Sequence, residues 1–170
     1  MKDPFEETIP SFEIDHTRLK PGLYISRFDV IYGAPITTFD LRFTRPNCII
    51  DPPLPTAALH TIEHLGAIYL RNYSGWGNEI VYFGPMGCRT GCYAVIAGEY
   101  DAHDQRIREL FIHMARFIMN WDDSEVPGAT PEGCGNFLDH NLLSAKRAMY
   151  KWLEVLESKQ LDYDPFVYPE

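Results

Sequence analysis

The sequence predicts an α+β fold, a single domain in which helices pack on one largely antiparallel sheet. Three observations lead to this class. The chain has 170 residues, which is the size of one domain. Stretches rich in β-branched and aromatic residues occur in two pairs, each separated by a short turn, as in hairpins. Three other segments repeat apolar residues at helical spacing. The predicted order of elements is ββαββαα.

The first strand pair is predicted over residues 23–32 and 36–43, on either side of Gly33-Ala-Pro35. Residues 1–10 contain two prolines and mostly polar side chains, so we expect a loose lead-in there. Four prolines between residues 46 and 55 then interrupt the chain before a strongly helical segment over 56–72.

The second strand pair is predicted over residues 79–83 and 92–97, around the glycine-rich turn 84–91. A helix over 104–121 follows, because its apolar residues form one stripe: Ile107, Leu110, Phe111, Met114, Ile118 and Trp121. After a loop over 122–135, a last amphipathic helix is predicted over 140–158. Residues 159–170 form an acidic, aromatic tail for which no structure is predicted. Residues 1–170 are therefore expected to form one domain.

Composition narrows the possible partners. Lys and Arg total 15 and Asp and Glu total 24, which gives a formal charge of −9. We therefore expect no binding to nucleic acid or to an anionic membrane. The amino terminus has no apolar core and no stretch is long enough to span a bilayer, so we expect neither a secretory signal nor a membrane span. Four cysteines are too few for a disulfide framework, and a cytoplasmic protein with reduced thiols is expected.

The strongest chemical signal is H-x-x-E-H in the predicted helix 56–72. His60 and His64 are four residues apart and project from one helix face, with Glu63 beside them. The segment is apolar almost all round, and burying these polar groups without partners would cost about a few kcal/mol each. A bound divalent cation removes that cost, because neutral imidazole is a natural metal ligand. The motif occurs in inverted zinc peptidases, so by itself it does not specify a reaction.

Two histidines require a further ligand, and the residues leave two possibilities. Cys88 and Cys92 together would complete a closed Cys₂His₂ site, which is structural. Cys134 alone would leave an open position for water or substrate, as in catalytic sites. Cys88 follows a glycine and precedes Arg89, where a lowered thiol pKa would make it a base or nucleophile.

The remaining polar residues have ordinary interpretations when taken alone. Arg42 would be an exposed ion-pair partner on a strand, and His140 would make a local hydrogen bond near the start of the last helix. Cys48 and Cys92 are expected to be packing residues.

Several motifs together resemble the S-ribosylhomocysteine lyase (LuxS) family, the autoinducer-2 synthases. The similarity covers about residues 11–157 and includes three reactive signatures in order: His60-Thr-Ile-Glu-His64, Pro85-Met-Gly-Cys-Arg-Thr-Gly91 and Gly133-Cys-Gly135. Further matches are Ser11-Phe-Glu-Ile-Asp-His16, Phe39-Asp-Leu-Arg-Phe43 with Pro46-Asn47, and Ala145-Lys-Arg147.

This resemblance implies a cytoplasmic bacterial homodimer with the LuxS fold, which is related to that of inverted zinc peptidases, and with active sites at the subunit interface. It implies one divalent metal per subunit and no organic cofactor. The metal is usually iron(II) and can be replaced by zinc or cobalt. The implied ligands are His60, His64 and Cys134.

The resemblance also implies the chemistry. S-ribosylhomocysteine would be cleaved to homocysteine and 4,5-dihydroxy-2,3-pentanedione, the autoinducer-2 precursor, by successive enolisations and a β-elimination. Cys88 and Glu63 would be the catalytic acid–base groups, and Ser11, His16 and Arg42 would line the substrate pocket.

The chain departs from the family pattern in several places, among them the N-terminal lead-in and the acidic tail. Tyr82-Phe-Gly84 stands where the family usually has Asp-Ile-Ser, so a carboxylate near Cys88 is missing, and Cys92 replaces an aromatic residue.

Two alternative functions remain. One is an inverted zinc peptidase with Glu63 as base, and the other is a binding module with a structural Cys₂His₂ zinc.

Overall fold

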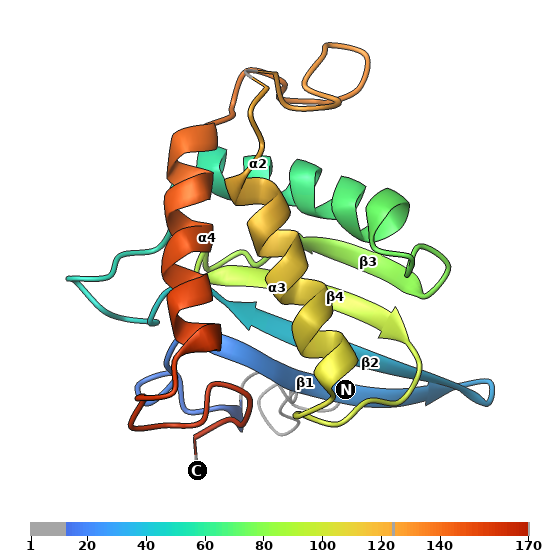
Figure 1. Ribbon diagram of the computed structural model, residues 1–170, viewed down its shortest axis with the longest axis vertical. Helices are drawn as coiled ribbons and strands as arrows, with labels where there is room; N and C mark the ends of the chain where they lie inside the picture. Colours follow the sequence, from blue (N-terminus) through green and yellow to red (C-terminus); the bar gives the residue numbers. More distant parts are fainter. Residues whose placement is uncertain (1–12, 124, 170) are drawn as a thin grey trace, which may run out of the picture.

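The computed structural model describes residues 13–123 and 125–169, and it confirms the α+β class. Four strands form one antiparallel sheet in the order β1-β2-β4-β3. Three helices lie together on one face of this sheet (Figure 1). The elements are β1 (Gly22–Ile31), β2 (Ala34–Arg42), α2 (Thr56–Ile68), β3 (Ile80–Pro85), β4 (Gly91–Ala97), α3 (Gln105–Met119) and α4 (Leu142–Glu157). Each predicted helix and strand is present, with ends shifted by a few residues.

The β1–β2 turn lies one residue earlier than the sequence predicts. Ile31 pairs with Ala34, so the turn consists of Tyr32 and Gly33, which have φ values of 50° and 83°. Two positive φ values give a turn whose twist matches that of the flanking strands. Pro35 belongs to β2, where its carbonyl accepts a hydrogen bond from the Gly98 N–H at 2.8 Å.

The long helix around His60 ends differently from a regular α-helix. After α2, the segment η1 (Tyr69–Tyr73) continues as a π-helical turn, in which the Ser74 N–H donates to the Tyr69 carbonyl at 3.0 Å. Leu70 in this turn is fully buried.

The other two helices begin at side-chain caps, because Asp104 accepts from the Arg106 N–H and Asn141 from the Ser144 N–H, both at 2.9 Å.

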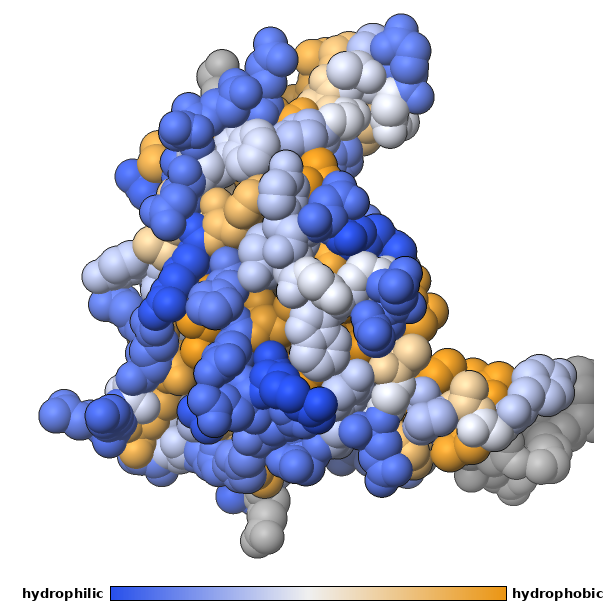
Figure 2. All heavy atoms as spheres, turned by 45° about the vertical axis from the view of Figure 1, so that its right-hand side comes forward, coloured by the Kyte–Doolittle hydropathy of each residue, from blue (hydrophilic) through white to orange (hydrophobic). Residues whose placement is uncertain are grey.

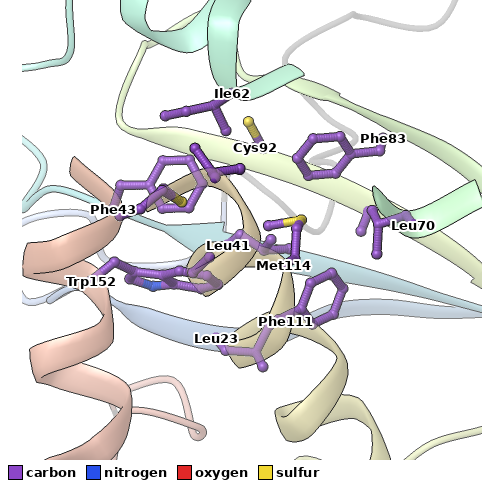
Figure 3. Close-up of a cluster of buried hydrophobic side chains, with 14 of the residues drawn as sticks. Leu23, Leu41, Phe43, Ile62, Leu70, Phe83, Cys92, Phe111, Met114 and Trp152 are labelled. Carbon is purple, nitrogen blue, oxygen red and sulfur yellow. The ribbon is translucent and has the colours of Figure 1, made fainter. Parts of the chain in front are cut away.

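One apolar cluster joins the helices to the inner face of the sheet (Figure 3). Trp152 of α4 is fully buried, packs edge-on against Phe43 at 5.0 Å, and donates from Nε1 to the Gly22 carbonyl at 3.0 Å. Helix α2 approaches β3 closely because residue 66 is glycine, and a Cβ there would lie 2.5 Å from Phe83 Cε1. Cys92 is fully buried in this cluster, as the packing interpretation predicts.

The carboxyl-terminal tail has a defined position beside β1. The Leu23 N–H donates to the Pro165 carbonyl at 2.7 Å, and Phe166 is buried in the core cluster. At the surface of the tail, Lys20 forms an ion pair with Asp162 at 3.0 Å. The chain therefore returns to its first strand after α4.

The outer face of the sheet carries none of the three helices (Figure 1). The strand register places Ile36, Thr38, Tyr93 and Val95 on this face, because their neighbours along each strand point into the core. At its far end the β1–β2 hairpin also exposes apolar side chains, seen as orange on the projecting arm in Figure 2: Phe28, Val30, Ile31 and Tyr32. Among the residues described here, no helix combines the length and apolar character that crossing a bilayer requires.

Candidate metal centre and thiol pocket

Helix α2 presents two histidines in an orientation suited to metal binding. The rings of His60 and His64 lie one helical turn apart, with centroids separated by 4.7 Å. His60 Nδ1 donates to the Asp139 carbonyl at 3.0 Å, and His64 Nδ1 donates to the Pro127 carbonyl at 2.8 Å. A carbonyl only accepts, so in each neutral imidazole Nε2 keeps its lone pair.

Cys134 is brought to these histidines by the loop between α3 and α4. Its Sγ lies 3.2 Å from His60 Nε2 and accepts from the Asn136 N–H at 3.4 Å. The loop is tight, because the N–H groups of residues 133 and 134 both donate to the Thr130 carbonyl. A Cβ on Gly133 would lie 2.8 Å from the Gly128 carbonyl oxygen, which explains why glycine precedes this cysteine.

His140 joins the same cluster, although the sequence indicates only a local hydrogen bond. Its ring stacks on His60 with 4.1 Å between centroids, and its Nδ1 lies 3.3 Å from Thr61 Oγ1. Thr61 donates its single hydroxyl proton to the Ala57 carbonyl at 2.9 Å, so it accepts from His140. His140 Nε2 therefore carries a lone pair, and this buried atom has no hydrogen-bond partner among the described residues.

These four side chains fit a transition-metal ion. Their ligand atoms all lie within 4.8 Å of one another. Imidazole nitrogen with thiolate suits zinc, iron and cobalt better than magnesium or calcium. An ion would also give the buried Nε2 of His140 the partner that it lacks. Cys92 lies in the core and Cys88 on an exposed turn, and neither belongs to the cluster, which argues against the Cys₂His₂ alternative.

Cys88 lies on the turn between β3 and β4, next to two hydrogen-bonding groups. Its Sγ is 3.0 Å from Thr90 Oγ1 and 3.8 Å from Arg42 Nη1. Burial raises the pKa of the Cys88 thiol, but the Thr90 hydrogen bonds and the Arg42 charge outweigh it. The pKa of Cys88 is therefore lowered, as the sequence interpretation requires of a base or nucleophile.

Arg42 is buried, so the prediction of an exposed ion-pair partner, made from this residue alone, is wrong. Only 1% of its surface is exposed, and its Nη2 donates to Asp40 Oδ2 at 2.5 Å while Nη1 donates to Thr90. The sheet explains this position: Asp40 and Arg42 alternate with core residues and share the outer face. Asp40 thus supplies a carboxylate beside Arg42 despite the departure at Tyr82.

Tyr82 and Gly84, which replace the family's usual Asp and Ser before Pro85, depend on each other sterically. A Cβ on Gly84 would lie 2.1 Å from the Tyr82 hydroxyl oxygen, so the tyrosine ring occupies space that a serine at position 84 would need. Tyr82 is 49% exposed on the outer face and does not enter the metal centre.

The predicted site residues line two neighbouring hollows. His16, Arg42 and Cys88 line one of about 390 Å³. His60 and Glu63 line another of about 360 Å³, and Met86 and Gly87 line both. The structure therefore forms a metal half and a thiol half on either side of one turn. Ser11 lies outside the described residues.

Comparison with known proteins adds to these geometrical findings. The family model for S-ribosylhomocysteinase (LuxS) matches residues 9–162. The S-ribosylhomocysteine lyase of Phocaeicola vulgatus is 49% identical over 96% of this chain and 98% of its own length. The lyases of Borrelia garinii subsp. bavariensis and Clostridium acetobutylicum are 47% and 45% identical, over 88% and 96% of this chain and 92% and 99% of their own lengths.

Proposed function

Because the chain belongs to the LuxS family of S-ribosylhomocysteinases, we propose that it cleaves S-ribosylhomocysteine to homocysteine and 4,5-dihydroxy-2,3-pentanedione. The observation that carries this proposal is the pairing of a His–His–Cys cluster with a thiol of lowered pKa across one turn. An inverted zinc peptidase has less support, because a thiolate stands where that class usually has a carboxylate ligand.

The metal half would hold one divalent ion per subunit. His60, His64 and Cys134 are its proposed ligands, and the donor set suits iron(II), with zinc or cobalt as substitutes. When bound, this ion would polarise the substrate oxygens and stabilise negative charge as the carbonyl moves along the sugar. The two backbone carbonyls that accept from Nδ1 fix the tautomer and the orientation of each imidazole, which leaves Nε2 available to bind the ion.

The protein residues supply proton transfer. Cys88, with its lowered pKa, takes a proton from the carbon next to the carbonyl and returns it to the former carbonyl carbon. The proton of the neighbouring hydroxyl moves to the former carbonyl oxygen, so the carbonyl shifts by one carbon, and Glu63 transfers protons on the metal side. In the last step a base removes the α-proton, the C–S bond breaks, and its electron pair leaves on sulfur, which is protonated to homocysteine. No net oxidation occurs. Ser11, His16 and Arg42 are the proposed substrate-binding residues.

We further propose that the working unit is a homodimer. The outer face of the sheet carries none of the helices and leaves Ile36, Tyr93 and Val95 only half-buried, so a second copy could cover these side chains there. The division of the site residues between two hollows supports active sites that a second subunit completes.

The direct test is release of homocysteine thiol from S-ribosylhomocysteine by protein loaded anaerobically with iron(II) or cobalt(II). Cys88→Ala is expected to lose at least about a hundredfold in rate and to keep its metal, since proton transfer is lost but no ligand is. Cys134→Ala is expected to lose the metal itself. Thiol release and metal content by elemental analysis are the two measurements.

Cys48→Ala is the matched control, because Cys48 is a half-buried cysteine that lines neither hollow. It should retain both rate and metal. Absence of thiol release from the metal-loaded protein would refute the lyase proposal. Loss of metal from Cys88→Ala would instead favour the structural zinc site.

A further inference from the structure

The carboxyl-terminal tail contacts Asp40, which forms a buried ion pair with Arg42 next to the Cys88 pocket. We propose that Tyr168, in this tail, is a positioning residue for Cys88. This inference rests on the proposed acid–base role of Cys88. The tyrosine does not touch the thiol. It acts through Asp40 and Arg42, which connect the tail to the turn that carries Cys88.

Tyr168 is held firmly in this position. Its hydroxyl donates to Asp40 Oδ2 at 2.9 Å, across 128 residues of sequence. Its ring stacks on Tyr24 of β1, with 4.6 Å between centroids and 16° between planes. Tyr24 is itself buried, and its hydroxyl donates to the Lys20 carbonyl at 2.9 Å. The tail therefore presents the Tyr168 hydroxyl to one oxygen of a buried carboxylate.

The Asp40–Arg42 pair uses only part of its hydrogen-bonding capacity. One oxygen, Oδ2, accepts from both Arg42 Nη2 and Tyr168, whereas Oδ1 has no partner among the described residues. Arg42 Nε likewise has no partner among them. Arginine and carboxylate usually form two parallel bonds when nothing prevents it. In the proposed arrangement, the Tyr168 hydroxyl holds the carboxylate in the orientation seen here, in which it accepts only one bond from Arg42.

The orientation of the Asp40 carboxylate affects the Cys88 thiol through Arg42. With Asp40 held by Tyr168, the Nη1 end of the guanidinium remains directed at Thr90 and at Cys88 Sγ, 3.8 Å away. Without the tyrosine hydroxyl, the carboxylate is free to rotate toward a two-bond pairing, and more of the Arg42 charge is neutralised by Asp40. Less of that charge then stabilises the thiolate, so the Cys88 thiolate becomes less favourable.

The groups that face Cys88 come from four parts of the chain. They are Arg42 from β2, Thr90 from the β3–β4 turn, Tyr93 from β4, and His16 from the segment before β1. Tyr168→Phe changes none of these side chains and removes one oxygen atom. A shift in the titration of Cys88 in this variant therefore reports on the Asp40–Arg42 pair.

Tyr163→Phe is the matched control, because it removes the same atom from another tail tyrosine. The Tyr163 hydroxyl donates to the Pro21 carbonyl at 2.9 Å and has no contact with Asp40. Both variants lose one tail hydrogen bond, so a purely structural role of the tail would affect both in the same way.

The measurement is the rate of Cys88 alkylation by iodoacetamide as a function of pH in the metal-loaded protein, with the modified peptide quantified by mass spectrometry. In Tyr168→Phe, the midpoint is expected to rise by about half a pH unit, which is about a threefold loss of thiolate below the midpoint. The acidic limb of the turnover profile should move by the same amount, with metal content unchanged. A chain ending at Val167 should show the same shift.

Equal midpoints in the wild type, Tyr168→Phe and the chain ending at Val167 would overturn the inference, as would equal shifts in Tyr168→Phe and Tyr163→Phe. The alkylation measurement requires no substrate. Failure of the lyase proposal would appear as absent homocysteine release, and failure of this inference as an unchanged thiol midpoint, so the two are distinguishable.

Discussion

At the scale of single residues, His140 is the side chain whose surroundings give most information about the metal centre. The Thr61 hydroxyl donates to one carbonyl and accepts from both the Asn141 N–H and His140 Nδ1. This arrangement fixes the His140 proton on Nδ1 and leaves Nε2 as an acceptor among the proposed ligands. A buried acceptor without a partner is unfavourable, and an ion or its bound water would satisfy it.

His140→Phe is therefore expected to weaken metal affinity by about ten- to a hundredfold, the range seen when a side chain supporting a metal ligand is lost. Phenylalanine keeps a planar ring to stack on His60 but provides no lone pair. Competition with a chromogenic chelator measures the change. His103→Phe, on an exposed histidine outside the cluster, should leave affinity unchanged. Equal affinities in the wild type and His140→Phe would show that Nε2 makes no contribution.

At the scale of elements, the contact between α2 and β3 helps to determine where the two histidines proposed as metal ligands lie. Gly66 is on α2, two residues after His64, and faces Phe83 of β3. A Cβ on Gly66 would lie 2.5 Å from Phe83 Cε1 and 3.3 Å from the Met114 sulfur. The missing side chain therefore permits the close helix–sheet packing that supports the site.

Gly66→Ala is expected to destabilise the protein by a net of about 1–2 kcal/mol. Overpacking against Phe83 costs about 1–3 kcal/mol, and the better helix propensity of alanine returns at most about 1 kcal/mol. Urea unfolding followed by circular dichroism measures the difference. The same substitution in a Phe83→Leu background should cost less, because the smaller side chain can move away. A Gly66→Ala protein as stable as the wild type would contradict this packing argument.

The elements themselves could be predicted from the sequence because local spacing determines them. The apolar stripe from Ile107 to Ile118 is buried along α3, and the H-x-x-E-H segment forms a helix. The exact β1–β2 turn could not be predicted, since Gly33 and Pro35 each favour a turn and only the register with β4 settles the choice. The π-helical end at Tyr69–Tyr73 leaves no comparable pattern in the sequence.

At the scale of the whole molecule, the face of the sheet that carries no helix is the proposed subunit interface. Val95 of β4 lies near the middle of this face, paired with Thr38 on one side and Tyr82 on the other. A charge placed there would be buried in the proposed dimer, where an unpaired charge is strongly unfavourable.

Val95→Lys is expected to convert a dimer into monomers of 19.6 kDa that retain metal but lose turnover. Tyr150→Lys, on the exposed side of α4 away from the sheet, should remain dimeric and active. Sedimentation velocity separates the two states. A dimeric, active Val95→Lys protein would exclude this face as the interface.

Some residues of the candidate site can be predicted from local sequence motifs, whereas others come together only through long-range folding. The H-x-x-E-H spacing selects His60 and His64, whereas Cys134 follows only from the resemblance to the family; the structure brings all three together. The motif spacing gives no sign that Arg42 is buried or that His140 joins the cluster, because both depend on the fold of the loop and the sheet. The Tyr168–Asp40 bond spans 128 residues and involves a tail without any predicted structure.

A metal ion held by the proposed ligands would also cross-link distant parts of the chain. It would join α2 to the loop before α4, and His60 and Cys134 are 74 residues apart in the chain. Closing a segment of that length restricts the unfolded ensemble much as a disulfide would, by about 4 kcal/mol for a permanent bond. A reversibly bound ion stabilises the native state by RT ln(1 + c/Kd), where c is the concentration of free metal, so its contribution increases with c. With the proposed ion bound, the stability of the fold, and not only catalysis, would therefore depend on the supply of metal.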